Sequence, residues 1–169
     1  MPQVHIATKF GAVLFLVWGI LHLWVPYDAF HNFHEGGLEK AVLGIAGGPN
    51  SPLDKVQVPK DAATANLMEG LIKNFVLDVG GYGVLGVAVA FKLWIEGDLF
   101  AFLLGLVVIG IADMSFLYFL VVPGGVIDLK FEVVLGPLVW FLAILVTPVG
   151  LFYGAQGGKN SSKNKKKVQ

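Results

Sequence analysis

The chain has 169 residues, of which 56% are hydrophobic and 14% charged, and its acidic and basic side chains balance to a net charge of zero. Soluble domains contain about 25% charged residues, so this chain has too little polar surface to cover a soluble domain of its size. A net charge of zero provides no global field to attract nucleic acid. The chain contains no cysteine, which excludes disulfides, thiolate nucleophiles and cysteine-ligated metal centres. We therefore expect an integral membrane protein, without a cofactor and without a nucleic-acid partner.

Four apolar stretches are long enough to cross a bilayer, whose hydrocarbon core of about 30 Å requires about 20 helical residues. They cover residues 10–27, 75–95, 99–122 and 133–155. Each stretch is continuous rather than alternating, which favours helices over the strands of a barrel. The predicted fold is all-α, a polytopic four-helix membrane bundle over residues 1–156. Residues 157–169 form a lysine-rich tail that we expect to be disordered and cytoplasmic.

The segment between the first two spans, residues 28–74, is too long for a plain connection. A short apolar helix is expected over residues 38–46, stopped by the Gly-Gly-Pro-Asn sequence at residues 47–50. A further helix is expected after Asp61, because aspartate is a favourable N-cap, and it can continue into the second span. We expect this segment to lie over the outer mouth of the bundle.

The lysine distribution predicts the orientation in the membrane. Four spans place both termini on one side, and the tail carries five of the chain's 12 lysines. The positive-inside rule then places both termini in the cytoplasm. A bacterial-type cytoplasmic membrane is favoured. An endoplasmic reticulum membrane is the alternative, because residues 166–169 (Lys-Lys-Val-Gln) have the form of a retrieval signal.

Small residues recur in the second span at Gly80, Gly81, Gly83 and Gly86. Small residues let helices approach closely in lipid, where no hydrophobic attraction drives them together. Besides the bilayer, the candidate partners are therefore another membrane protein or a second copy, bound through the glycine-rich helices. Residues 81–86 also match G-x-G-x-x-G, but the dinucleotide motif requires a preceding strand, so we reject that interpretation.

Four ionisable residues lie in the outer half of the predicted spans or at their outer mouth. An ionisable group inside a membrane helix is costly and is a functional hypothesis by default. The pattern predicts an outward-facing polar pocket with Asp113 at its floor and His22 on its wall. The predicted lining residues are Trp18, His22, Asp78, Asp113, Ser115, Glu132 and Trp140.

His22 and Asp113 are also the candidate catalytic residues. A histidine–carboxylate pair can exchange a proton near neutral pH, act as general acid and base, or neutralise itself. The alternative is that Asp113 is protonated, or hydrogen-bonded to Ser115 or to a neighbouring helix, and only locks the packing.

Asp28, His31 and His34 recur every three residues. On a helix they would share one face, and imidazole with carboxylate suits zinc, iron or nickel. The spacing matches no established catalytic signature, and a third ligand in a rigid frame is not evident. We interpret the segment as a solvated turn after a membrane helix and predict no metal site.

Three stretches of the chain are similar to known proteins. Residues 11–22 read GAVLFLVWGILH, residues 110–113 read GIAD, and residues 136–140 read GPLVW. These stretches resemble small four-helix membrane proteins found mostly in bacteria, a group without an assigned activity. The resemblance covers most of residues 9–152. It implies that Trp18, His22, Asp113 and Trp140 belong to a recurring motif set.

Three classes of function remain open. The preferred one is a non-catalytic membrane component or accessory subunit. The second is a small membrane enzyme that acts on a lipophilic substrate with His22 and Asp113 as acid–base groups. The third is a proton or solute pathway, which the apolar inner halves of the spans and the absence of an inverted repeat disfavour.

Overall fold

The computed structural model describes residues 4–47, 57, 59–122 and 127–165, and their side chains as far as Tyr153. Within these residues every element is helical. In chain order they are α1 (Ile6–Ala46), α2 (Ala62–Glu96), α3 (Leu99–Leu104), the π-helical turn η1 (Gly105–Ile109), α4 (Gly110–Phe116), the π-helical turn η2 (Leu117–Val121) and α5 (Phe131–Lys165). The four elements from α3 to η2 follow one another without a break and form a single long helix.

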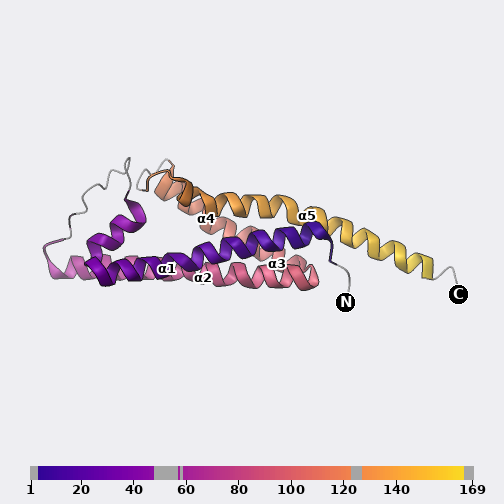
Figure 1. Cartoon of the computed structure of the whole chain (residues 1–169), viewed down its shortest axis with the longest axis horizontal. Helices are drawn as coiled ribbons and strands as arrows, with labels where there is room; N and C mark the ends of the chain where they lie inside the picture. Colours follow the sequence, from indigo (N-terminus) through magenta and orange to yellow (C-terminus); the bar gives the residue numbers. More distant parts are fainter. Residues whose placement is uncertain (1–3, 48–56, 58, 123–126, 166–169) are drawn as a thin grey trace.

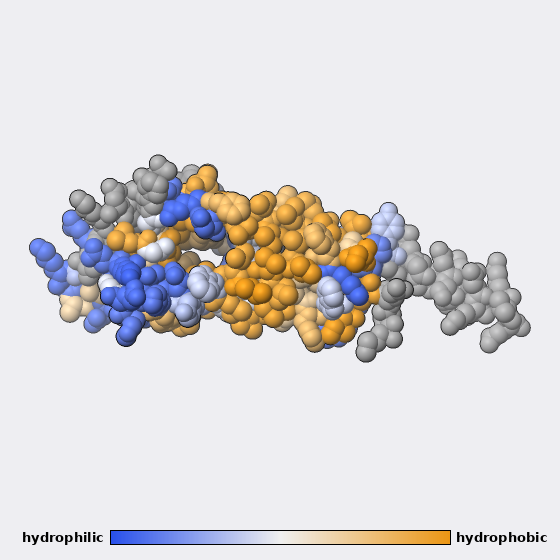
Figure 2. Space-filling model, in the orientation of Figure 1, coloured by the Kyte–Doolittle hydropathy of each residue, from blue (hydrophilic) through white to orange (hydrophobic). Residues whose placement is uncertain are grey.

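Four helices in the described part of the chain are long and apolar enough to cross a membrane. They are Ile6–Ala46, Ala62–Glu96, Leu99–Val121 and Phe131–Tyr153. On the face shown in Figure 2, hydrophobic residues cover the middle of the molecule, and hydrophilic residues gather chiefly at the left end, with a smaller group toward the right. Exposed apolar surface of this extent is suited to lipid rather than water. The predicted all-α fold with four membrane-spanning helices is confirmed.

The helix α1 extends far beyond the predicted end of the first span at residue 27. It includes Pro26 and leaves helical geometry only at Gly36 and Gly37, where Gly37 has a left-handed φ of 65°. The interpretation of residues 28–35 as a turn is therefore wrong. No breaking residue lies between Pro26 and Gly36, and an established helix propagates at low cost.

Residues 38–46, which we call the arm, form the last part of α1 and fold back beyond the Gly36–Gly37 kink (Figure 1). Ala46 packs against Val121 and Ile127, and the Lys130 ammonium group donates a hydrogen bond to the carbonyl oxygen of Gly47. The arm thus lies against the end of the bundle where η2 stops and α5 starts. We call this the arm end, and the opposite end, where α1 begins, the terminal end.

The helix α2 begins where the sequence predicts it. The Asp61 carboxylate caps it by accepting a hydrogen bond from the backbone N–H of Thr64 at 2.9 Å. Hydrogen bonds from the hydroxyl group and the backbone N–H of Thr64 lower the pKa of Asp61. The helix then runs without interruption to Glu96, so the cap and the second span belong to one element. The sequence also predicts that the Gly-Gly-Pro-Asn sequence at residues 47–50 ends the preceding helix. Gly47 is indeed the C-cap of α1, and residues 48–50 lie outside the described part of the chain.

The helix α5 also runs further than predicted. It continues to Lys165, through most of the tail for which the sequence predicts disorder. The two glycines at residues 157–158 do not end it. The last four residues, 166–169, lie outside the described part of the chain.

Glycines bring α1 and α2 into backbone contact. A Cβ atom at Gly83 would lie 2.8 Å from the carbonyl oxygen of Gly19, and one at Gly86 would lie 2.8 Å from the Trp18 ring. A Cβ atom at Gly80 would similarly meet the ring of Pro26. Gly80, Gly83 and Gly86 are therefore covered by α1, whereas a Cβ atom at Gly81 would have nothing within 4 Å. Binding of a partner through the glycine-rich helices stays a prediction. Close approach of this kind maximises van der Waals packing between membrane helices.

Candidate functional site

Asp113 lies in α4, a seven-residue α-helical segment between the two π-helical turns. It is buried, with 2% of its surface exposed, within the helix Leu99–Val121 that is apolar enough to cross a membrane. An unpaired charge in such a place is strongly disfavoured. The partners of its carboxyl group therefore determine what the site can do.

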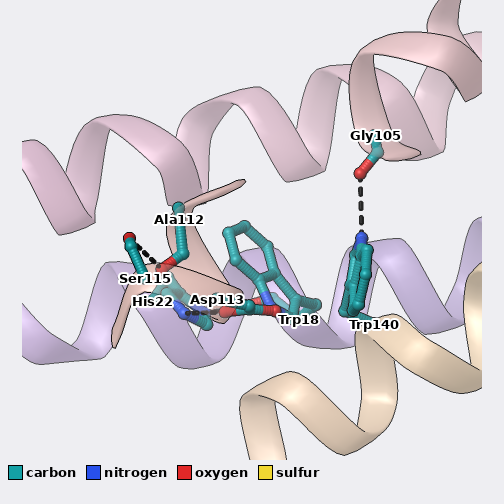
Figure 3. Close-up of polar contacts among 7 residues, drawn as sticks. All are labelled: Trp18, His22, Gly105, Ala112, Asp113, Ser115 and Trp140. Carbon is teal, nitrogen blue, oxygen red and sulfur yellow. Dashed lines mark hydrogen bonds and ion pairs between the residues drawn. The ribbon is translucent and has the colours of Figure 1, made fainter. Parts of the chain in front are cut away.

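The partners of Asp113 come from α1 (Figure 3). The indole N–H of Trp18 donates a hydrogen bond of 2.9 Å to Asp113 Oδ2. His22 Nε2 lies 3.7 Å from Asp113 Oδ1. Trp18 and His22 reach one carboxyl group together because residues four apart lie on the same face of a helix. The predicted pairing of His22 with Asp113 is thus present in the structure.

The second nitrogen of His22 fixes the ring and its tautomer. His22 Nδ1 lies 2.8 Å from the carbonyl oxygen of Trp18, and since a carbonyl oxygen only accepts, Nδ1 carries a hydrogen and donates. The imidazole also stacks on the Trp18 ring, with 3.6 Å between centroids and 22° between planes. Nε2 therefore faces Asp113, and one proton can lie on either the imidazole or the carboxyl group.

The helix α5 covers the cluster from another side. A Cβ atom at Gly136 would lie 2.8 Å from Cε1 of His22 and 3.8 Å from Nε1 of Trp18. Glycine at this position leaves room for the His22 ring, whereas the distance to Trp18 would be an ordinary van der Waals contact. The sequence analysis missed this role of Gly136, and a glycine beside a proline in an apolar run gives no signal that would reveal it. We refer to Trp18, His22, Asp113 and Gly136 as the polar cluster.

Trp140, one of the predicted lining residues, is buried and bonds to another helix instead of to the polar cluster. Its indole N–H donates a hydrogen bond of 2.9 Å to the carbonyl oxygen of Gly105, the first residue of η1. A Cβ atom at Gly110 would lie 2.6 Å from the Trp140 ring. Trp140 therefore fixes α5 against the π-helical turn and forms no hydrogen bond with the polar cluster.

Three further residues of the predicted pocket lining are not joined to the polar cluster by a hydrogen bond or ion pair. Ser115 is exposed and donates to the carbonyl oxygen of Ala112 at 3.0 Å, so it is not the partner of Asp113. Asp78 is exposed and accepts from Asn74 at 2.8 Å. Glu132 is exposed in the first turn of α5. The sequence positions of these residues indicate how deep each one lies along its membrane span. They do not indicate the direction in which each side chain points, and that direction keeps all three away from the polar cluster.

The residues considered for a metal site lie in the helical part of α1 before Gly36. Asp28 accepts a hydrogen bond from Asn32 at 3.0 Å, His31 lies 3.2 Å from Glu35, and His34 is exposed. Among the described residues no three His, Asp or Glu side chains form a group that could hold a metal ion. The lack of a metal site stays a prediction.

No protein-family model, curated protein or solved structure matches this chain. The resemblance to small bacterial four-helix membrane proteins therefore stays a prediction. Of its four motif residues, Trp18, His22 and Asp113 meet in the polar cluster. The functional argument rests on that geometry alone.

Proposed function

We propose that the protein is a non-catalytic multi-pass membrane component, an accessory subunit whose polar cluster holds its helices in one arrangement. The observation that carries the proposal is the enclosure of Asp113. Both of its oxygens face partners on α1, and its side chain is 3% exposed. A carboxyl group that is enclosed and provided with partners in this way suits interhelical attachment better than contact with a substrate.

A second candidate function is a proton-binding site within a proton pathway. The observation that favours it is the orientation of His22, whose Nδ1 is fixed by the Trp18 carbonyl while Nε2 faces Asp113. A proton can move between the imidazole and the carboxyl group when His22 Nε2 and Asp113 Oδ1, which are 3.7 Å apart, come within hydrogen-bond distance. The His22 side chain is 18% exposed, so it is the member of the pair that water can reach more easily.

The experiment compares the wild-type protein with Asp113→Asn, which retains the shape of the side chain but cannot hold or release the proton. For an accessory subunit, both chains should copurify from their native membrane with the same stoichiometric partner. In vesicles with an imposed pH gradient, neither chain should accelerate proton flux over protein-free vesicles. Flux that the wild type supports and Asp113→Asn abolishes would contradict the proposal and establish the proton pathway instead. Purification of the chain alone, without a partner, would also contradict it.

We further propose that both termini lie in the cytoplasm of a cell with a bacterial-type membrane. The support is the lysine-rich tail and the positive-inside rule. Cysteine introduced by Ser51→Cys should react with an impermeant thiol reagent on intact cells, whereas cysteine introduced by Ser161→Cys should react only after lysis. The chain has no native cysteine to interfere. Labelling of the second variant on intact cells would reverse the proposed orientation.

A further inference from the structure

A groove of about 490 Å³ lies at the terminal end of the bundle, between α1, α2 and α5. Its wall includes Ile6, Lys9, Phe10, Val13, Trp94 and Val146, and all of its lining surface is apolar. The groove is shallow and open to the surface rather than enclosed. Phe10 is 55% exposed and Trp94 is 48% exposed, so the groove opens on the surface of helices that are apolar enough to cross a membrane.

Lys9 provides a positive charge beside this apolar groove. Its Nζ lies 5.2 Å from the centroid of the Trp94 ring, an arrangement that stabilises the ammonium group without neutralising it. Three other lysines, Lys40, Lys73 and Lys92, each form an ion pair with a glutamate. Lys9 has no carboxylate partner among the described residues.

We propose that the groove binds an anionic phospholipid, with an acyl chain along its apolar wall and the phosphate group at Lys9. Tryptophan is typical of the membrane interface, where its apolar ring lies at the level of the headgroups. A lysine at that depth extends its apolar stem along the protein and places its charge among the headgroups. The groove thus combines a surface for the chain with an unneutralised cation for the headgroup.

Charge complementarity selects an anionic phospholipid over the other occupants. A zwitterionic phospholipid could fill the apolar wall equally well, but its positive headgroup would offset the attraction of its phosphate to Lys9. A second copy of this chain would cover the groove but would require a carboxylate opposite Lys9. Anionic lipids give the cytoplasmic leaflet a negative surface potential that attracts a lysine near the membrane surface.

The test measures quenching of Trp94 fluorescence by brominated lipids in nanodiscs. A Trp24→Phe background removes the exposed tryptophan at the other end of the band, and Trp18 and Trp140 are buried. We expect brominated phosphatidylglycerol to compete for the site about fivefold better than brominated phosphatidylcholine, as estimated for one basic residue near an anionic surface. In Lys9→Gln the two lipids should compete equally, so that the ratio of their apparent affinities falls from about five to about one. Lys9→Arg retains the positive charge and should retain the preference.

The matched control is Lys92→Gln, which removes a lysine of α2 that is already paired with Glu96 at 2.8 Å and should leave the lipid preference unchanged. Equal quenching by the two lipids in the Trp24→Phe protein would overturn the proposal. A preference that survives in Lys9→Gln would overturn it as well. Absence of quenching by either lipid, together with a dimeric mass in the nanodisc, would assign the groove to a second copy instead.

Discussion

Asp113→Leu is expected to lower the free energy of unfolding by about 2 kcal/mol, whereas Asp113→Asn should change it little. Leucine leaves the indole N–H of Trp18 and Nε2 of His22 without their partner, since both face the Asp113 carboxyl group. A buried donor that loses its acceptor costs its full desolvation free energy. Asparagine avoids this cost because its amide oxygen can accept from the indole N–H of Trp18 in place of the carboxyl oxygen.

Reversible unfolding in detergent micelles, followed by circular dichroism, measures this difference. A matched control is Met114→Leu, the neighbouring residue of α4, which is 47% exposed and should unfold like the wild type. A loss of stability in Asp113→Asn as large as in Asp113→Leu would show that the carboxyl group acts as a charge. The hydrogen bond between Trp18 and Asp113 would then not explain how Asp113 stabilises the protein.

The four spans could be predicted because bilayer thickness sets the required length and lipid forces the backbone into helices. The pairing of Asp113 with His22 could be anticipated for a related reason. A carboxyl group buried in an apolar helix requires a partner, and His22 is the only histidine inside a predicted span. Depth along each helix follows from the sequence at 1.5 Å per residue, so both residues could be placed in the outer half of their spans, with His22 about 7 Å shallower than Asp113.

The rotation of each helix about its axis could not be predicted, and it decided which polar residues met. Ser115 is two residues from Asp113 but is exposed and bonds to its own helix. Trp18 was singled out by family resemblance, although its spacing of four residues from His22 was a usable signal for a shared face. Gly136 reaches the polar cluster only through the packing of α5 on α1, which depends on the register between two distant parts of the chain.

The π-helical turns were also beyond sequence reasoning. Both η1 and η2 lie in the apolar run of residues 99–122. Glycines stand at both ends of η1, at Gly105 and Gly110, but glycines are equally common in the α-helical part of α2, and η2 contains neither glycine nor proline. Trp140 donates to the carbonyl oxygen of Gly105 at the start of η1, where the ladder of helical hydrogen bonds changes register. Such turns are frequent at functional sites, and here they bracket the segment that carries Asp113.

The contact between α1 and α2 should be as important for folding as the polar cluster. We expect Gly83→Ala to lower the free energy of unfolding by about 1–3 kcal/mol, the usual cost of overpacking. The added methyl group would meet the carbonyl oxygen of Gly19 and the backbone nitrogen of Leu23, each at 2.8 Å. Backbone atoms cannot rotate away as a flexible side chain can, so the two helices would have to separate.

Gly81→Ala is the matched control, because it makes the same substitution two residues away on the same helix. A Cβ atom at Gly81 would have nothing within 4 Å, so only the helix propensity changes, which favours alanine by up to about 1 kcal/mol. The two variants should therefore shift the unfolding transition in opposite directions. Separation of α1 from α2 would also move the Trp18 ring, which lies against Gly86, so Gly83→Ala should change tryptophan fluorescence while Gly81→Ala does not. Equal stability of the two variants would contradict the close backbone contact and, with it, the position of α1 that brings Trp18 and His22 to Asp113.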